Sequence, residues 1–208
     1  FYPDDAISPY VAIAACGPWI ITSKGRVLHD SGGYGMLGFG HTPESVIAAM
    51  AKPQVMANIM SPNFSQLRVS KALRAEIGHT RGACPYSRFL TLNSGSESVS
   101  LAGRIADTNT KLHTDPGGRH AGKRVKRIAM KGAFHGRTEL PCLYSDSSRK
   151  AYAANLASWK HHENQLITIE PYSIDGLKQA FADADANGWY IEAMFLEPVM
   201  GEGDPGRA

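Results

Sequence analysis

The stretch LTLNSGSE, residues 90–97, changes from an apolar run to small polar residues, and a helical pattern begins directly after it. Residues 89–92 predict a short buried strand, and Leu101 and Ile105 recur at helical spacing after the turn. Gly95 lets a ligand approach the backbone, and the first amides of a helix have no internal acceptor, so a bound anion gains hydrogen bonds. This strand, turn and helix therefore suit a phosphate group. The competing interpretation is an ordinary helix N-cap.

Length and composition indicate one large folded domain, or one domain and a piece. The chain has 208 residues, of which 43% are hydrophobic and 20% are charged, so it can bury a substantial core. The formal net charge of +3 is a mild excess that does not require a polyanionic partner. Cys16, Cys84 and Cys142 are odd in number and show no Cys-x-x-Cys spacing, so we expect a reducing, cytoplasmic compartment.

No membrane or export segment is predicted. No apolar run approaches membrane-spanning length, and the first residues lack the basic and apolar regions of a signal peptide. The chain does not begin with Met, and residues 201–208 form a glycine-rich stretch with nothing after it to pack. We therefore expect the chain to be a piece of a longer protein.

Several motifs are weaker than they look. Residues 33–38 and 201–206 both contain the G-x-G-x-x-G spacing, but the first lacks the later acidic residue and the second lacks a following helix. The basic run at 123–127 has no interleaved aromatic residues, which favours a solvated loop that runs into a strand over a nucleic-acid patch. His113 and His120 have no Cys or carboxylate at ligand spacing, so no metal site is predicted.

Alternating strands and helices predict an α/β fold, a three-layer sandwich built on a mostly parallel sheet. Strands are expected at 125–130, 166–169 and 191–196, with a helix at 173–187. A small antiparallel meander and two helices precede them, at residues 11–15, 19–22, 26–29, 43–50 and 65–78.

Ligands bind beyond the carboxyl ends of strands in such sheets, and three candidate loops lie there. They are residues 93–97, 132–138 and 197–203. Together they hold a phosphate turn, an aromatic residue with a His and an Arg, and two carboxylates.

These motifs, in this order, resemble the class III pyridoxal-phosphate-dependent aminotransferases of fold type I, of the ornithine and 4-aminobutyrate type. The matching stretches are Gly40-His41 with Pro43, NSGSE at 93–97, FHGRT at 134–138 and EPVMGEG at 197–203. The resemblance covers nearly the whole chain. It implies pyridoxal 5'-phosphate as cofactor and transfer of an amino group between an amine or amino acid and a 2-oxo acid.

The resemblance also implies a domain division and a homodimer or higher homo-oligomer. Residues 1–62 would form an N-terminal arm and part of the small domain, and residues 63–208 the first part of the large cofactor-binding domain. The stretch 58–64 is apolar enough to lie at a subunit interface, although a simple interhelix loop explains it as well. Residues 107–122 are polar and contain Gly and Pro, which predicts a loop. They look longer than the usual connection in the family, and no role is carried over to them.

Six residues are implied as cofactor ligands. The phosphate would bind at Ser94, Gly95 and Ser96. Phe134 would stack on the pyridine ring, His135 would close the ring pocket, and Glu197 would lie near the ring. A His beside a glycine could equally be a structural hydrogen-bonding residue.

Three further residues are implied in substrate binding. Arg137 matches the residue that holds a substrate carboxylate, because a guanidinium fork makes two parallel hydrogen bonds to it. The alternative for Arg137 is a surface ion pair. Glu202 resembles the carboxylate that pairs with a switching Arg later in the chain of the family, and Tyr34 matches a position that contacts substrate in some members.

No catalytic residue is expected within this chain. The Schiff-base Lys and the Asp that protonates the pyridine nitrogen lie downstream of the Glu-Pro motif in the family, beyond Ala208. The alternatives to an aminotransferase are a non-catalytic module without that lysine, or an aminomutase, racemase or decarboxylase on the same cofactor.

Overall fold

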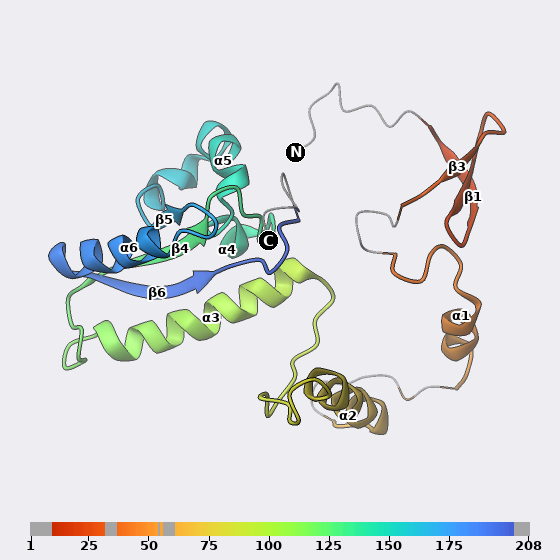
Figure 1. The fold of residues 1–208 in the computed structure, drawn as a ribbon, viewed down its shortest axis with the longest axis horizontal. Coiled ribbons are helices and arrows are strands. Elements are labelled where there is room, and N and C mark those ends of the chain that lie inside the picture. The colour runs from red at the N-terminus through yellow and green to blue at the C-terminus, as the bar shows by residue number, and fades with distance from the viewer. Residues whose placement is uncertain (1–9, 32–36, 54, 56–60, 202–208) are drawn as a thin grey trace. The chain divides into compact units, whose positions relative to one another are not determined.

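The computed structural model describes residues 10–31, 37–53, 55 and 61–201 (Figure 1). The chain divides into two compact units, Phe1–Arg88 and Phe89–Ala208. The first unit holds a small antiparallel sheet and two helices, and the second holds a parallel sheet with helices packed against it.

The first unit begins with the predicted meander. Strands β1 (Ala12–Cys16), β2 (Trp19–Thr22) and β3 (Val27–His29) pair antiparallel in the order β1-β2-β3. The turns contain Gly17 and Gly25, both with positive φ, a backbone conformation that glycine adopts without steric cost.

The Gly40-His41 motif ties the meander to the segment after it. The backbone of His41 exchanges hydrogen bonds with Gly17, and its ring lies 2.9 Å from a carboxylate oxygen of Asp30. A Cβ on Gly40 would lie 2.8 Å from the backbone of Gly17, so only glycine fits. In this unit the motif therefore has a structural function.

Both predicted helices of the first unit are confirmed. Helix α1 spans Glu44–Met50 with Pro43 as its N-cap, and α2 spans Phe64–Gly78. Helix α2 begins with a capping box: the amide of Gln66 donates to the Asn63 side chain, and the Gln66 side chain accepts from the Asn63 amide.

The second unit is built on three parallel strands in the order β5-β4-β6. They are β4 (Arg124–Met130), β5 (Leu166–Ile169) and β6 (Trp189–Phe195). The α/β prediction is therefore confirmed, with strand boundaries within two residues of those expected.

Different helices cover the two faces of this sheet. On one face Ile128 and Ile169 pack against Ala180 of α6 (Ile174–Ala186). On the other face Phe195 stacks on Tyr144, with ring centroids 3.8 Å apart. Tyr144 in turn lies against Gly103 of α3 (Gly95–Thr114), where a Cβ would meet its hydroxyl at 2.7 Å.

Four short helices that the sequence did not predict follow the 132–138 loop. They surround a second core cluster of Cys142, Leu143, Tyr152 and Trp159. The helices are α4 (Glu139–Cys142), η2 (Asp146–Ser148), α5 (Arg149–Asn155) and η3 (Ala157–His161).

Two expectations were wrong. Residues 89–92 form no strand, and Leu90 and Leu92 are 67% and 44% exposed, because β4 is already paired on both sides and neither outer strand pairs with this stretch. Residues 107–114 belong to α3 and not to a loop. Their polar side chains are compatible with a helix because the hydroxyls of Thr108 and Thr114 donate to carbonyls four residues earlier.

Candidate active site

The start of α3 is capped by its own side chains. The Ser94 hydroxyl accepts from the Glu97 amide at 3.2 Å, and the Glu97 carboxylate accepts from the Asn93 amide at 2.8 Å. By helix geometry the amides of Gly95 and Ser96 have no acceptor within the helix. A Cβ on Gly95 would meet nothing within 4 Å among the described residues, so the space beside its Cα is open. Ser94 is thus an N-cap, and the two amides after it can still receive an anion.

Phe134 is held in place by Glu197. One carboxylate oxygen of Glu197 accepts from the Phe134 amide at 2.9 Å, and the other accepts from the Gly201 amide, also at 2.9 Å. The two residues are 63 positions apart in the chain. The loop after β4 and the loop after β6 are therefore joined by one side chain, as expected for loops at the same edge of a parallel sheet.

His135 lies buried beside this junction. Its amide donates to the Ser145 hydroxyl at 2.9 Å, and its ring meets the ring of Phe195 edge-on at 5.9 Å. Its Nε2 atom is buried without a hydrogen-bond partner in the described part of the chain. Burial lowers the pKa of His135, although the nearby Glu197 carboxylate and a backbone hydrogen bond to Phe195 act in the opposite direction.

Gly136 brings the start of α3 and the 132–138 loop into contact. Its φ is +125°, and a Cβ there would lie 2.5 Å from the hydroxyl of Ser96 and 3.0 Å from Pro141. The backbone of the loop thus lies directly against the second residue of α3. The candidate phosphate turn and the candidate ring platform therefore form one local site within the second unit.

Arg137 follows at the point where the loop becomes exposed. Its guanidinium carbon lies 5.5 Å from the centroid of the Phe134 ring. A guanidinium and a planar cofactor cannot share one face of that ring. Arg137 is exposed, so its side chain lies at the solvent-facing end of the loop.

Two predicted site residues, Tyr34 and Glu202, lie outside the residues that the structure describes. The other seven lie in the second unit. The rings of His113 and His120, for which no metal site was predicted, pack on Tyr190 with ring centroids 6.0 and 5.2 Å from it.

The sequence reasoning missed Ser145 and Asp146, whose side chains bind amides of the 132–136 loop. Both are small polar residues that follow a run of apolar side chains, residues 140–144, and polar residues that stay buried need partners. That pattern marks a buried polar contact but does not say which amide it serves.

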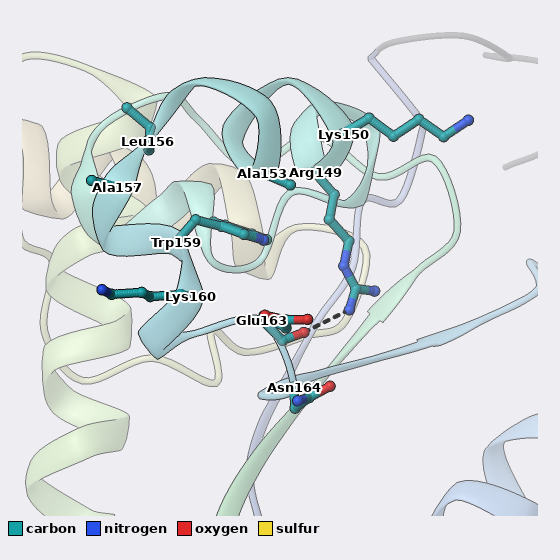
Figure 2. Close-up of a pocket in the computed structure, with 9 residues that line it drawn as sticks. All are labelled: Arg149, Lys150, Ala153, Leu156, Ala157, Trp159, Lys160, Glu163 and Asn164. Carbon is teal, nitrogen blue, oxygen red and sulfur yellow. Dashed lines mark hydrogen bonds between the residues drawn. The ribbon is translucent and has the colours of Figure 1, made fainter.

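A separate groove of about 690 Å³ lies over α5 and η3 (Figure 2). Its basic side chains do not converge: Lys150 and Lys160 point away from one another, and Arg149 donates to the carbonyl of Glu163 at 2.9 Å. No feature of this groove favours one bound anion. The lining residues are Arg149, Lys150, Ala153, Leu156, Ala157, Trp159, Lys160, Glu163 and Asn164.

The sequence matches the class-III aminotransferase family over residues 3–205, and the chain belongs to that family. Within the described ranges, no helix is long and apolar enough to cross a membrane.

Solved structures with a similar fold are also aminotransferases. Ornithine aminotransferase from Toxoplasma gondii is 22% identical, with a TM-score of 0.66 over 97% of this chain and 44% of its own. An amine transaminase from an uncultivated Pseudomonas species, solved in its PLP-bound form, is 19% identical, with a TM-score of 0.69 over 100% of this chain and 49% of its own. N-acetylornithine aminotransferase from Stenotrophomonas maltophilia is 19% identical, with a TM-score of 0.62 over 98% of this chain and 45% of its own. The chain therefore spans less than half the length of these relatives.

Pyridoxal 5'-phosphate is the cofactor that family membership implies, and the residues present fit it. The open space at Gly95 leaves room for a phosphate beside two helix-terminal amides. Half-buried Phe134 offers an apolar platform, and the unpartnered Nε2 of His135 is a polar atom that a bound ring system could satisfy.

Proposed function

We propose that this chain forms the cofactor-phosphate and ring-binding part of an aminotransferase that moves an amino group between an amine or amino acid and a 2-oxo acid. The observation that supports the proposal most is the contact of Gly136 with Ser96. It joins the phosphate turn to the ring platform, as one cofactor that carries both a phosphate and a ring requires.

In this proposal the chain supplies binding and orientation. The amides of Gly95 and Ser96 hold the phosphate, which the positive end of the α3 dipole also attracts. Phe134 packs on the ring, and Glu197 keeps Phe134 in place through the backbone. When bound, pyridoxal phosphate supplies an electron sink for the bonds at the amino-bearing carbon.

His135 is proposed to close the ring pocket in its neutral form, because burial lowers its pKa. Arg137 is proposed to bind the far carboxylate of an acidic substrate, since it is exposed next to the ring platform. Tyr34 and Glu202 remain proposed substrate-binding residues on the resemblance of their motifs.

The remaining proposals concern the whole protein. A homodimer is supported by Phe64, which is 80% exposed at the end of the proposed interface stretch, and a fully active monomer would contradict it. A cytoplasmic location is supported by the free thiols of Cys16, Cys84 and Cys142. A stable disulfide between any two of them in the isolated protein would argue against it. The domain division at residues 62 and 63 stays a prediction, and limited proteolysis that cuts only near Arg88 would contradict it.

The function is tested with the full-length protein, a panel of amines and amino acids, and a 2-oxo acid acceptor. Formation of the new amino acid, dependent on added pyridoxal phosphate, is the expected result. Cofactor binding without any transfer would favour a non-catalytic module. Release of the substrate carboxylate as carbon dioxide, or racemisation or rearrangement of the amino acid, would place the protein among the other enzymes on this cofactor.

A further inference from the structure

The hydroxyl of Ser145 is fully buried at the back of the ring-binding loop. It accepts from the His135 amide at 2.9 Å. Its one hydrogen is shared between the Gly136 carbonyl at 3.1 Å and the Pro141 carbonyl at 3.0 Å. One side chain therefore binds the backbone of both His135 and Gly136, the glycine with positive φ.

The two residues after Ser145 bind the same loop at its beginning. The Asp146 carboxylate accepts from the Gly132 amide at 2.8 Å. The amide of Ser147 donates to the Ala133 carbonyl at 3.1 Å. Three consecutive residues thus contact three different points of the 132–136 loop.

These contacts fix the direction of Phe134 from both sides. The Phe134 amide is bound by Glu197. On one side of it the Ala133 carbonyl is bound by Ser147, and on the other side the His135 amide is bound by Ser145. A buried amide that loses its acceptor carries a substantial free-energy penalty, so the loop does not change its path easily. The backbone on both sides of Phe134 is consequently held by Ser145, Ser147 and Glu197, which limits the directions that its side chain can take.

We propose that Ser145 and Asp146 are positioning residues of the cofactor site, which act through the backbone of the 132–136 loop to orient Phe134 and His135. This proposal rests on the proposed function, because the loop must contact pyridoxal phosphate for its orientation to matter. Neither residue has to touch the cofactor. Ser145 controls the peptide after Phe134, and Asp146 anchors the loop where it leaves β4.

The test titrates pyridoxal phosphate into the full-length protein and follows the circular dichroism of the bound cofactor, which reports its orientation. Ser145→Ala is expected to raise the Kd for the cofactor about tenfold, the effect of losing one buried hydrogen bond, and to weaken the dichroic band. Asp146→Ala is expected to act in the same direction. Ser147→Ala is the matched control, because Ser147 is exposed and uses only its backbone amide.

A purely structural role gives a different result. In that case melting temperatures with and without cofactor fall equally in Ser145→Ala, while the Kd and the dichroic band stay parental, and the proposal is overturned. If Ser145→Ala does not fold, the Asp146→Ala variant tests the proposal by the same two criteria, because Asp146 is only half-buried. If the parent protein does not bind pyridoxal phosphate, the proposed function fails first, and this proposal fails with it.

Discussion

The start of α3 and the 132–136 loop touch at Gly136, yet they are held in place in opposite ways. The α3 start is exposed and capped by Ser94 and Glu97, whose hydrogen bonds span three and four positions of the chain. The 132–136 loop is largely buried, and its side-chain acceptors lie 10, 14 and 63 positions away.

This difference indicates which parts of the site tolerate change. A turn that is stabilised locally and open to solvent accepts a new side chain without altering the fold. A loop fixed by distant partners does not. Substitutions in the turn should therefore change ligand binding, and substitutions in the loop should first change stability.

The largest expected effect is that of Gly136→Ala. Alanine is strained at the φ of +125° that residue 136 adopts, and its Cβ would overlap the Ser96 hydroxyl. We therefore expect a loss of about 3 to 5 kcal/mol in the free energy of unfolding. Gly95→Ala is the control, because its Cβ meets nothing within 4 Å, and it should change stability by less than about 0.5 kcal/mol. Denaturant titration of both variants measures the difference. Equal losses would refute the contrast between the two regions.

Arg137→Ala examines the point where the buried loop becomes exposed. Loss of a bidentate contact to a carboxylate should cost about 2 to 4 kcal/mol of transition-state stabilisation for acidic substrates, and far less for simple monoamines. Arg137→Lys should restore activity only partly, since an ammonium cannot reproduce the fork. Steady-state kcat/KM for one carboxylated and one uncharged amine provides the measurement.

The control for Arg137 is Arg149→Ala, which removes the same charge from the groove over α5 and η3. It should leave both substrates unaffected. Equal losses on both substrates in Arg137→Ala would mean that Arg137 is structural.

Gly95→Val tests the open turn as an anion site. The branched side chain would occupy the open space beside the Gly95 Cα and hinder the approach of a phosphate to the backbone, so the Kd for pyridoxal phosphate should rise about 10- to 100-fold. Stability should stay near that of the parent, because no described residue lies within 4 Å of a Cβ at this position. Fluorescence or absorbance titration measures the affinity. Parental affinity in this variant would remove Gly95 from the site.

The smallest expected effect is a pH dependence that comes from His135. Burial holds the pKa of His135 below its ordinary value of 6.5, so the unfolded chain takes up the proton first as the pH falls. Its contribution to stability is therefore complete above pH 6.5 and declines as the pH falls from there through the lower pKa of the folded protein. His135→Asn should flatten this part of the stability profile.

Burial also lowers the pKa of His120, so the comparison is made in a His120→Asn background. Denaturant titrations between pH 7.5 and pH 5, a range set by the ordinary His value, give the two slopes. An unchanged slope after His135→Asn would show that the His135 ring is not the group responsible.

Local signals in the sequence predicted most of the fold. Glycines marked the turns of the meander, Gly78 marked the end of α2, and apolar runs marked β4, β5 and β6. The strand prediction for residues 89–92 was wrong because an apolar run does not reveal whether a neighbouring strand is there to pair with it. The loop prediction for residues 107–114 was wrong because it was based on polar composition.

The candidate site was predictable to the same degree. The turn at Ser94 was predicted as a phosphate site from the local sequence, and the role of Phe134 as a ring platform was implied by the resemblance to the family; both roles stay predictions. The links made by Glu197, Ser145 and Asp146 to loop amides were not predicted, since contacts over 63, 10 and 14 positions leave no periodic signal. The carboxylate of Glu197 was expected near the cofactor ring, and in the structure it also binds two backbone amides.

The most direct measurement is a crystal structure of the full-length protein grown with pyridoxal phosphate. If the start of α3 and the 132–136 loop form one cofactor site, the phosphate will accept hydrogen bonds from the Gly95 and Ser96 amides while the ring lies against Phe134. A phosphate bound elsewhere, or a ring that does not touch Phe134, would contradict the account.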